Sequence, residues 1–515
     1  MFKRIINITI WTLIGLYTAI IILLHIPSIQ TYIGGCVADA LCDKFGTKVK
    51  VGRVDLGYIN RLILDDSYMQ DKNGEQMLRV SRISVKINLL ALANGQIEIT
   101  SAQFFGLHAN LYKATPEAKP NFQFVIDALA SKDSTKQKTP LDLQINSLII
   151  RNGEISYRVL SRPSRPGKFS ADDINARNIS AHIIINRITD DSLNVKVKRI
   201  AFDERCGFKL KSLSLSAIAC RTKTKIENFK LELPATLIQI PSLQASYRMK
   251  NGQIEMPTLQ FDGSIKAPYI SPSNLAVFVP TLTRLNMRPA LDIQFNGTGS
   301  SLTVKKISIN TTDGSLQLVA NGGVKNYPAN PSWYTNIDQL KAGQQAISNI
   351  YAVATGKNVP NIIERLGNVQ ITGYAGGDKK NIASEGKLHT SPGNLTLAFD
   401  KRGDKITAHM ETVRFNIGSL VNDNKLGHIS ANLNVHGSSK DNFAAQGRVY
   451  DFDYNGYKYR SLNLNATYRN KRLEGKANID DPNVQLTAIG TFVNNGAKPN
   501  LQLKANIAHF EPNTL

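Results

Sequence analysis

The stretch Gly427-His-Ile-Ser-Ala-Asn-Leu-Asn-Val435 alternates apolar and polar residues without interruption. Successive side chains of a β-strand point to opposite faces, so this period of two predicts a strand with one apolar and one polar face. The same alternation returns in 462–469 and 501–507. The apolar positions of these three segments that concern us are Ile429, Ala431, Leu433, Val435, Leu462, Leu464, Leu501 and Leu503.

Related segments recur along the chain. Ile99-Thr-Ser, an apolar run and Gly106 resemble Ile145-Asn-Ser, a second apolar run and Gly153. We interpret each copy as two short strands joined at a glycine or asparagine turn. Asn251-Gly252, which separates two further apolar runs, is a strong hairpin signal because both residues tolerate positive φ. With 515 residues, the chain is too long for one ordinary core, and repetition favours a stack of hairpins.

The expected fold class is therefore all-β, an elongated antiparallel β-groove made of a curled, repetitive sheet with few helices. An amphipathic helix is expected at 27–46, where Gly46 is a natural stop, and a helical insert at about 338–366. The polar segment 131–139 is the best linker candidate. It separates an N-terminal β region, 47–130, from the repetitive region, 140–515.

The N-terminus has the pattern of a membrane anchor. Residues 5–26 contain no acid, lysine or arginine, and 22 helical residues reach about 33 Å, enough to cross a bilayer. A cleaved signal peptide would have a shorter apolar stretch and a small-residue cleavage site, which is missing here. Lys3 and Arg4 hold residues 1–4 in the cytoplasm and place the rest outside it. The expected anchor residues include Ile5, Trp11, Leu16, Ile22 and Ile26.

Charge and cysteine content narrow the choice of partners. The net charge is +22, from 62 basic and 40 acidic residues, which favours anionic surfaces such as lipid headgroups. Export from the cytoplasm argues against nucleic acid as a partner. Cys206 and Cys220 flank an expected strand, and either a disulfide or two free thiols is compatible with their positions.

No catalytic or metal-binding motif is present. HExxH, GxSxG and GxxxxGK[ST] are all missing, and Gly297-Thr-Gly299 lacks the third glycine and the helix of a dinucleotide loop. His428 and His436 are about 26 Å apart on an extended strand, too far to share a metal. We therefore expect no enzymatic activity, no cofactor and no metal site.

The apolar sheet face must be covered in some way. With few helices available, the sheet closes as a sandwich or curls into an open trough, and a period of two does not distinguish these. A trough would suit acyl chains, since burying each CH₂ group is worth about 0.8 kcal/mol without specific contacts. Its candidate lipid-binding lining is Ile429, Ala431, Leu433, Val435, Leu462, Leu464, Leu501 and Leu503.

The order and spacing of several segments resemble the AsmA-like superfamily and, within it, TamB-like translocation and assembly modules of the Bacteroidota type. The N-terminal segments are 5–26, 36–45, Val49-Lys-Val-Gly-Arg-Val-Asp-Leu56, Leu62-Ile-Leu-Asp-Asp66, Asp71-Lys-Asn-Gly-Glu-Gln-Met-Leu78, 83–99 and Asn121-Phe122. The later ones are Ile270-Ser-Pro-Ser-Asn-Leu-Ala-Val-Phe-Val-Pro-Thr-Leu282, Gly297-Thr-Gly299, Gly367-Asn-Val-Gln-Ile-Thr-Gly373 and Ile479-Asp-Asp-Pro-Asn483. The resemblance covers nearly the whole chain.

The resemblance implies a single-pass inner-membrane protein with a long periplasmic groove and a role in outer-membrane biogenesis. That role is either phospholipid transfer or protein secretion and β-barrel assembly with an outer-membrane barrel of the TamA/BamA type. The family's C-terminal module is not found, so we expect an N-terminal portion or a shortened relative. A passive envelope scaffold with a closed core is the remaining alternative.

Overall fold

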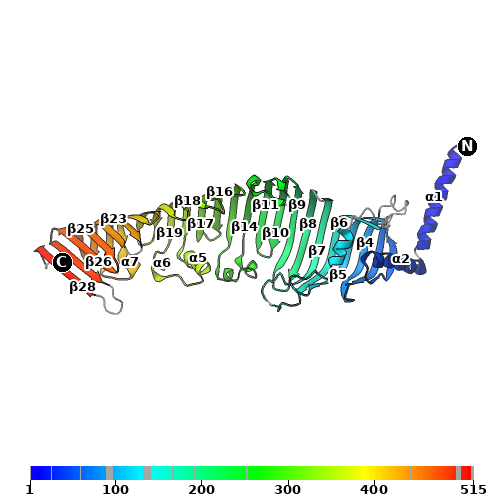
Figure 1. Ribbon diagram of the computed structural model, residues 1–515, viewed down its shortest axis with the longest axis horizontal. Helices are drawn as coiled ribbons and strands as arrows, with labels where there is room; N and C mark the ends of the chain where they lie inside the picture. Colours follow the sequence, from blue (N-terminus) through cyan, green and yellow to red (C-terminus); the bar gives the residue numbers. More distant parts are fainter. Residues whose placement is uncertain are drawn as a thin grey trace. The chain divides into compact units, whose positions relative to one another are not determined.

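The computed structural model describes residues 2–24, 26–57, 60–87, 97–130, 141–164, 167–189, 192–250, 253–439, 442–493 and 500–511. They form two compact units, which we describe separately. The first contains residues 1–242 and 273–280, and the second contains residues 243–272 and 281–515. Both consist mainly of antiparallel β-sheet with few helices (Figure 1), so the all-β class is confirmed. The expected linker at 131–139 lies outside the described residues.

Two helices open the chain, α1 (Phe2–Leu24) and α2 (Pro27–Phe45). As expected, α2 ends at Gly46, which is left-handed and donates its backbone N–H to the carbonyl oxygen of Cys42. Gly34 lets α2 approach the sheet, because a Cβ at this position would lie 3.3 Å from Val54. Within the described residues, no helix is long and apolar enough to cross a membrane, so the structure does not support the membrane-spanning assignment of 5–26.

The first unit contains a sheet in which most neighbouring strands are antiparallel. β3 pairs with both β1 and β2, and the order then follows the chain from β3 to β10. The strands are β1 (Val49–Lys50), β2 (Arg53–Gly57), β3 (Arg61–Gln70), β4 (Gln76–Ile87), β5 (Ile97–Lys113), β6 (Leu141–Val159), β7 (Asp173–Thr189), β8 (Ser192–Glu204), β9 (Lys209–Cys220) and β10 (Lys223–Leu233). Helix α4 (Gln123–Ala130) lies between β5 and β6 in the sequence.

The recurring segments at 99 and 145 are not hairpins, which corrects the interpretation from sequence. Each belongs to one long strand, β5 or β6, and the two strands pair in parallel with Ser101 opposite Ser147. Gly106, with φ of +62°, bends β5 without reversing it. A glycine in a strand permits either a turn or a bend, and the alternation on both sides is the same for both.

The second unit is an antiparallel meander. The consecutive pairings of its main sheet run from β14 to β28 in chain order. Its strands are β14 (Gln260–Tyr269), β15 (Pro289–Thr298), β16 (Ser301–Thr311), β17 (Leu316–Lys325), β18 (Ser332–Ala342), β19 (Val369–Gly377), β20 (Asn381–His389), β21 (Asn394–Arg402), β22 (Lys405–Asn416), β23 (Leu426–Ser439), β24 (Asn442–Tyr454), β25 (Tyr457–Arg469), β26 (Arg472–Asp481), β27 (Val484–Val493) and β28 (Asn500–Phe510).

Short elements complete the chain. β11 (Thr236–Ser246) connects the two units in sequence, and β12 (Met249–Lys250) pairs with β13 (Gln253–Ile254) on either side of the expected Asn-Gly turn, which is itself outside the described residues. The 3₁₀ turns are η1 (Met256–Thr258), η2 (Pro272–Asn274) and η3 (Pro280–Arg284). All four cysteines are free thiols, so Cys206 and Cys220 are not bridged.

The helical insert is shorter than expected. It consists of α5 (Gln344–Thr355) and α6 (Asn361–Glu364), whereas residues 338–342 complete β18. Leu340 belongs to the strand because it pairs with Leu318 on one side and Ile371 on the other. The apolar spacing of 338–342 fits either a helix or a strand, and sheet pairing decides between them.

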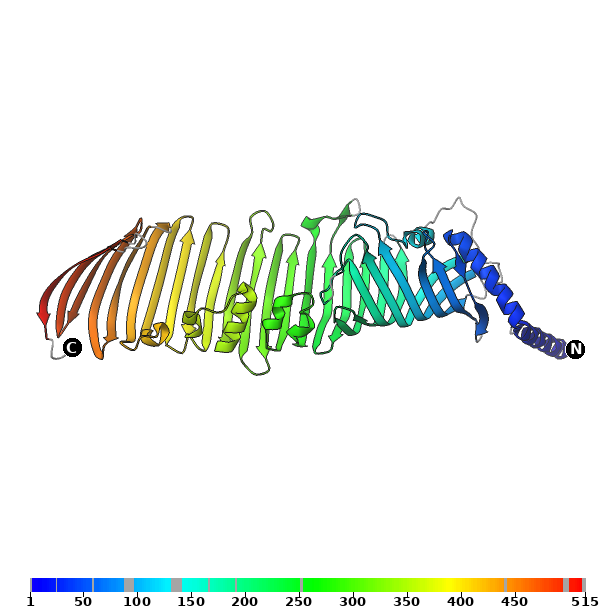
Figure 2. The same ribbon diagram turned by 90° about the horizontal axis from the view of Figure 1, so that it is seen from below.

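From β17 onward, the ends of the strands form two long edges of the sheet, and the connections between strands differ at these two edges. One edge, which we call the helix edge, contains the insert α5–α6, helix α7 (Ile417–Val421) and the turns that precede β21, β25 and β27. The opposite edge, the turn edge, contains the connections that precede β18, β20, β22 and β26, while the segments before β24 and β28 lie outside the described residues. Figure 2 shows the helices along one edge of the strands. Ala346 of α5 is buried in a cluster with Met287, Leu316 and Ala342.

Candidate functional site

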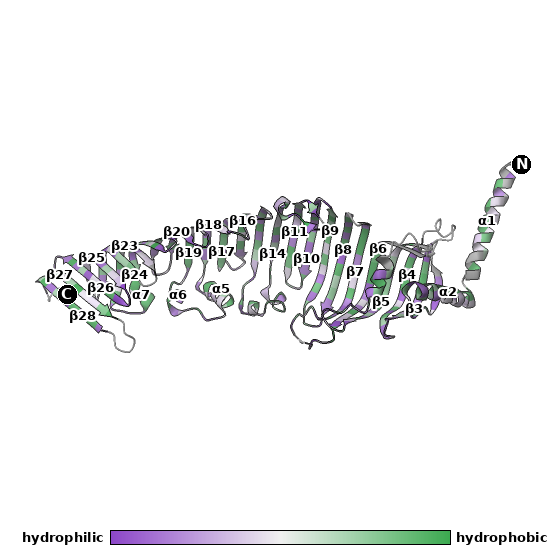
Figure 3. Ribbon diagram, viewed as in Figure 1, coloured by the Kyte–Doolittle hydropathy of each residue, from purple (hydrophilic) through white to green (hydrophobic). Residues whose placement is uncertain are grey.

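The register of β21–β28 arranges their alternating side chains in rows that run across the strands on one face. Figure 3 shows this alternation as bands of opposite hydropathy along the strands. One row is Leu397, Met410, Leu433, Gly447, Leu464, Ala477, Ala488 and Ala505. The next is Phe399, Ala408, Val435, Ala445, Ala466, Gly475, Gly490 and Leu503. We call the side of the sheet that these rows occupy the apolar face.

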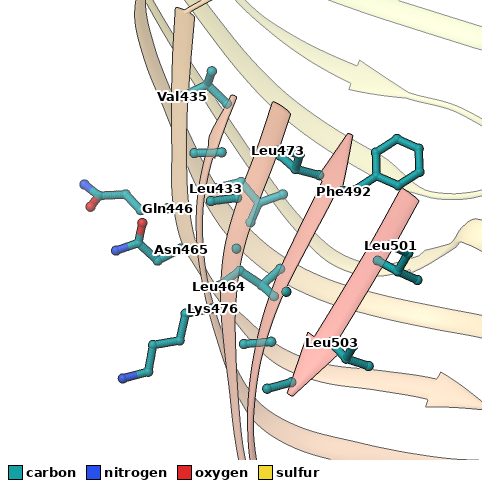
Figure 4. A pocket seen from close by; sticks show the side chains of 16 residues that line it. Leu433, Val435, Gln446, Leu464, Asn465, Leu473, Lys476, Phe492, Leu501 and Leu503 are labelled. Carbon is teal, nitrogen blue, oxygen red and sulfur yellow. The ribbon is translucent and has the colours of Figure 1, made fainter. Parts of the chain in front are cut away.

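The two rows consist largely of glycine and alanine, and larger side chains border them. A third row toward the turn edge continues through Phe443, Tyr468, Leu473, Phe492 and Leu501. The small residues leave a hollow of about 370 Å³ that is open to solvent. Figure 4 shows leucine, valine and phenylalanine side chains around it, while Gln446, Asn465 and Lys476 point to the opposite side of the sheet.

The helix edge and the turn edge differ in how well the apolar face is covered. Leu316, Ala342, Val369, Phe415 and Val484 are buried and lie at the helix edge. Toward the turn edge, Leu473 remains 40% exposed and Phe492 36% exposed, although both are large and apolar. The helices therefore close one border of this face, and no second sheet in the described part of the unit packs over the remainder.

Five of the eight lining residues expected from sequence border the hollow: Leu433, Val435, Leu464, Leu501 and Leu503. The other three do not. Ala431 has no exposed surface and pairs with buried Thr412 on one side and buried Val449 on the other. Ile429 and Leu462 lie nearer the helix edge, where Ile429 pairs with buried Phe415. These three residues lie beside the hollow and do not line it.

The sequence reasoning missed the lining supplied by β26 and β27. Leu473, Gly475, Ala477, Ala488, Gly490 and Phe492 all border the hollow. The alternation of Leu473, Gly475 and Ala477 was visible in the sequence, but glycine and alanine give a weak apolar signal. Their contribution is the missing side-chain volume, which only the register reveals.

The expected anchor residues lie on α1 and beside it. Trp11, Leu16, Ile22 and Ile26 are all exposed, as is Arg4. The side chains of Lys3 and Ile5 lie outside the described residues. An uncovered apolar helix surface is compatible with a membrane anchor and with a protein contact alike.

Comparisons with known proteins return no relatives. No protein-family model matches this chain, and neither a curated protein nor a solved structure is significantly similar to it.

Proposed function

We propose that this chain binds and transfers phospholipid along the apolar face of its second unit, as an inner-membrane-anchored envelope biogenesis protein that directs lipid toward the outer membrane. The main support for this proposal is the hollow in β23–β28, a solvent-open apolar surface whose floor consists of glycine and alanine. Soluble proteins rarely leave large contiguous apolar patches exposed unless the patch binds something. Of the described residues that border the hollow, none has a carboxylate, imidazole, hydroxyl or thiol group, and we propose transport without chemistry.

The shape of the hollow favours a flexible chain over a rigid ligand. Glycine or alanine recurs on every strand from β24 to β27, so the floor of the hollow extends across these strands. An acyl chain can follow such a path, gaining about 0.8 kcal/mol for each CH₂ group removed from water. Because the contacts are apolar and non-directional, a bound chain can also slide.

The location and partners belong to the same proposal. Helix α1, with Lys3 and Arg4 in its first turn, would hold the protein in the inner membrane with its bulk in the periplasm. The sequence resemblance to TamB-like proteins also implies an outer-membrane barrel of the TamA/BamA type as a candidate partner.

A photo-reactive amino acid at position 464 tests the proposal, with position 465 as the matched control. Leu464 borders the hollow, whereas Asn465 is the next residue and points to the opposite face (Figure 4). After incubation of the full chain with phosphatidylethanolamine and phosphatidylglycerol vesicles and illumination, mass spectrometry should find lipid adducts at 464 and not at 465. Adducts to unfolded outer-membrane proteins would instead support an assembly function. Intramolecular adducts alone would leave a scaffold and refute lipid binding.

A further inference from the structure

The two edges of the second unit differ in charge. Three hairpins at the turn edge, Asp378-Lys-Lys380, Lys401-Arg-Gly-Asp-Lys405 and Arg469-Asn-Lys-Arg472, contain eight lysines and arginines and two aspartates. At the helix edge, the turn Thr390–Gly393 has no charge, and the turn after β26 follows Asp480 and Asp481. An anion at this sheet is therefore attracted toward the turn edge.

Two of these turns touch, and we define their four lysines, Lys379, Lys380, Lys401 and Lys405, as the lysine cluster. Lys401 lies on the apolar face, and Lys405, which pairs with Arg402, begins on the opposite face. The backbone N–H of Gly403 donates to the carbonyl oxygen of Lys380 over 3.2 Å, and Lys401 pairs with Ile382 and Ile406 across the strands. Of the described residues, no carboxylate forms an ion pair with Lys380, Lys401 or Lys405.

Two acids near the cluster, Asp378 and Asp400, have partners of their own, and a third, Asp404, lies in the turn between Lys401 and Lys405. Asp378 accepts backbone N–H groups from Lys380 at 2.7 Å and from Asn381 at 2.9 Å. These hydrogen bonds, of which that from Lys380 is the largest cause, lower the pKa of Asp378. The Asp378 carboxylate is therefore bound to the backbone of its own turn. Asp400 forms an ion pair with Arg402. The four lysines thus retain charge that can meet an external anion.

Lys401 relates the cluster to the hollow. It occupies the apolar face in the same cross-strand row as Phe443, Leu473 and Phe492, with Ile406 and Gly437 between them. β21 is two strands from β23, which is about 10 Å at the usual strand spacing. A lysine with apolar neighbours lays its stem along them and extends its ammonium group to the rim.

We propose that the lysine cluster binds the phosphate of an anionic phospholipid whose acyl chain occupies the apolar face. This inference rests on the proposed function and adds selectivity to it. The lipid would lie across the strands with its headgroup at the turn edge and its tail in the hollow, because the three turn-edge hairpins have eight basic residues against two acidic ones and lie beside exposed Leu473 and Phe492. A zwitterionic lipid would gain less, since its own cation offsets the attraction.

The test compares uptake of acyl-labelled phosphatidylglycerol and phosphatidylcholine from vesicles by the full chain. The variant K380Q/K401Q/K405Q removes three charges at the turn edge, and K341Q/K425Q/K458Q removes three exposed charges at the helix edge. The wild type should prefer phosphatidylglycerol, and the first variant should lower that preference by about fivefold or more, given the usual contribution of a lysine near anionic headgroups. The control variant should keep the preference, and phosphatidylcholine uptake should be unchanged in all three proteins.

Other outcomes separate the two proposals. Equal preference in the wild type and the turn-edge variant would overturn the headgroup site and leave lipid binding intact. Failure of the wild type to take up either lipid would refute both. Soluble glycerol 3-phosphate is the third arm: if it binds the wild type as strongly as the intact lipid, the cluster is a site for free phosphate and the assignment to lipid is wrong.

Discussion

Filling the hollow at Gly475 should abolish lipid uptake without weakening the fold. Gly475 lies in the row of small residues, and a Cβ there would be 3.8 Å from both Ala466 Cβ and the carbonyl oxygen of Asn465, ordinary contact distances. Its φ is not in the left-handed region, so a side chain introduces no backbone strain. Replacing a strand glycine removes a penalty of about 0.5–1 kcal/mol. We therefore expect Gly475→Leu to unfold at the same temperature as the wild type or slightly above it.

The effect on uptake follows from the volume that the leucine occupies. A leucine side chain of four carbons excludes about four CH₂ groups of a bound chain, which costs about 3 kcal/mol, or about 100-fold in affinity. The assay is transfer of an acyl-labelled phospholipid from vesicles, and the matched control is Lys476→Leu, which adds the same side chain on the opposite face (Figure 4). Normal uptake by a folded Gly475→Leu protein would refute the placement of the acyl chain.

Three further predictions concern packing and titration. Ala431→Asp should lower the free energy of unfolding by about 3–5 kcal/mol, because it buries an unpaired charge. Leu433→Asp should lower it by less than about 2 kcal/mol and should block lipid uptake. Equal losses of unfolding free energy for the two variants in urea denaturation would contradict an open hollow. Asp481, 1% exposed, accepts hydrogen bonds from Tyr457 and from the backbone of Arg460 and Asn483, so Asp481→Ala should cost about 1–3 kcal/mol by the same measurement, and an unchanged midpoint would refute this role. Burial raises the pKa of Asp71, but hydrogen bonds from Tyr112, Asn121 and two backbone groups outweigh it and leave the pKa lowered. The stabilisation from ionised Asp71 is therefore complete above the unfolded pKa of about 3.9 and is lost as the pH falls through the lower folded pKa. Asp71→Asn should flatten this part of the curve of unfolding free energy against pH. An unaltered curve would contradict the role of the Asp71 carboxylate.

Much of the fold followed from local pattern. The alternation in 427–435 predicted β23, and Gly46 marked the end of α2, because strand period and left-handed caps depend on near neighbours. The bend at Gly106 and the parallel pairing of β5 with β6 did not follow. They depend on which strand lies alongside, and residues 99–113 have the same alternation in either arrangement.

The hollow was only partly predictable for a similar reason. The hydrophobic side chains of Leu433 and Leu464 indicate an apolar face, whereas Gly475 and Gly490 contribute to the hollow because they have no side chain. Their alignment in one row depends on the register between β26 and β27, which neither segment encodes alone. Ala431 shows the converse, since its place in the alternation matches that of Leu433, yet it has no accessible surface between buried Thr412 and Val449 on the neighbouring strands.

The meander of β14–β28 has a consequence for how such a protein changes in evolution. Each strand bonds only to the strand before it and the strand after it in the chain. Gain or loss of two consecutive strands would therefore return the backbone to the same edge with its direction unchanged, and the flanking ladders could rejoin. The reach of the sheet can grow or shrink in steps of about 10 Å, two strand spacings, by duplication of a short coding segment, without redesign of any distant contact.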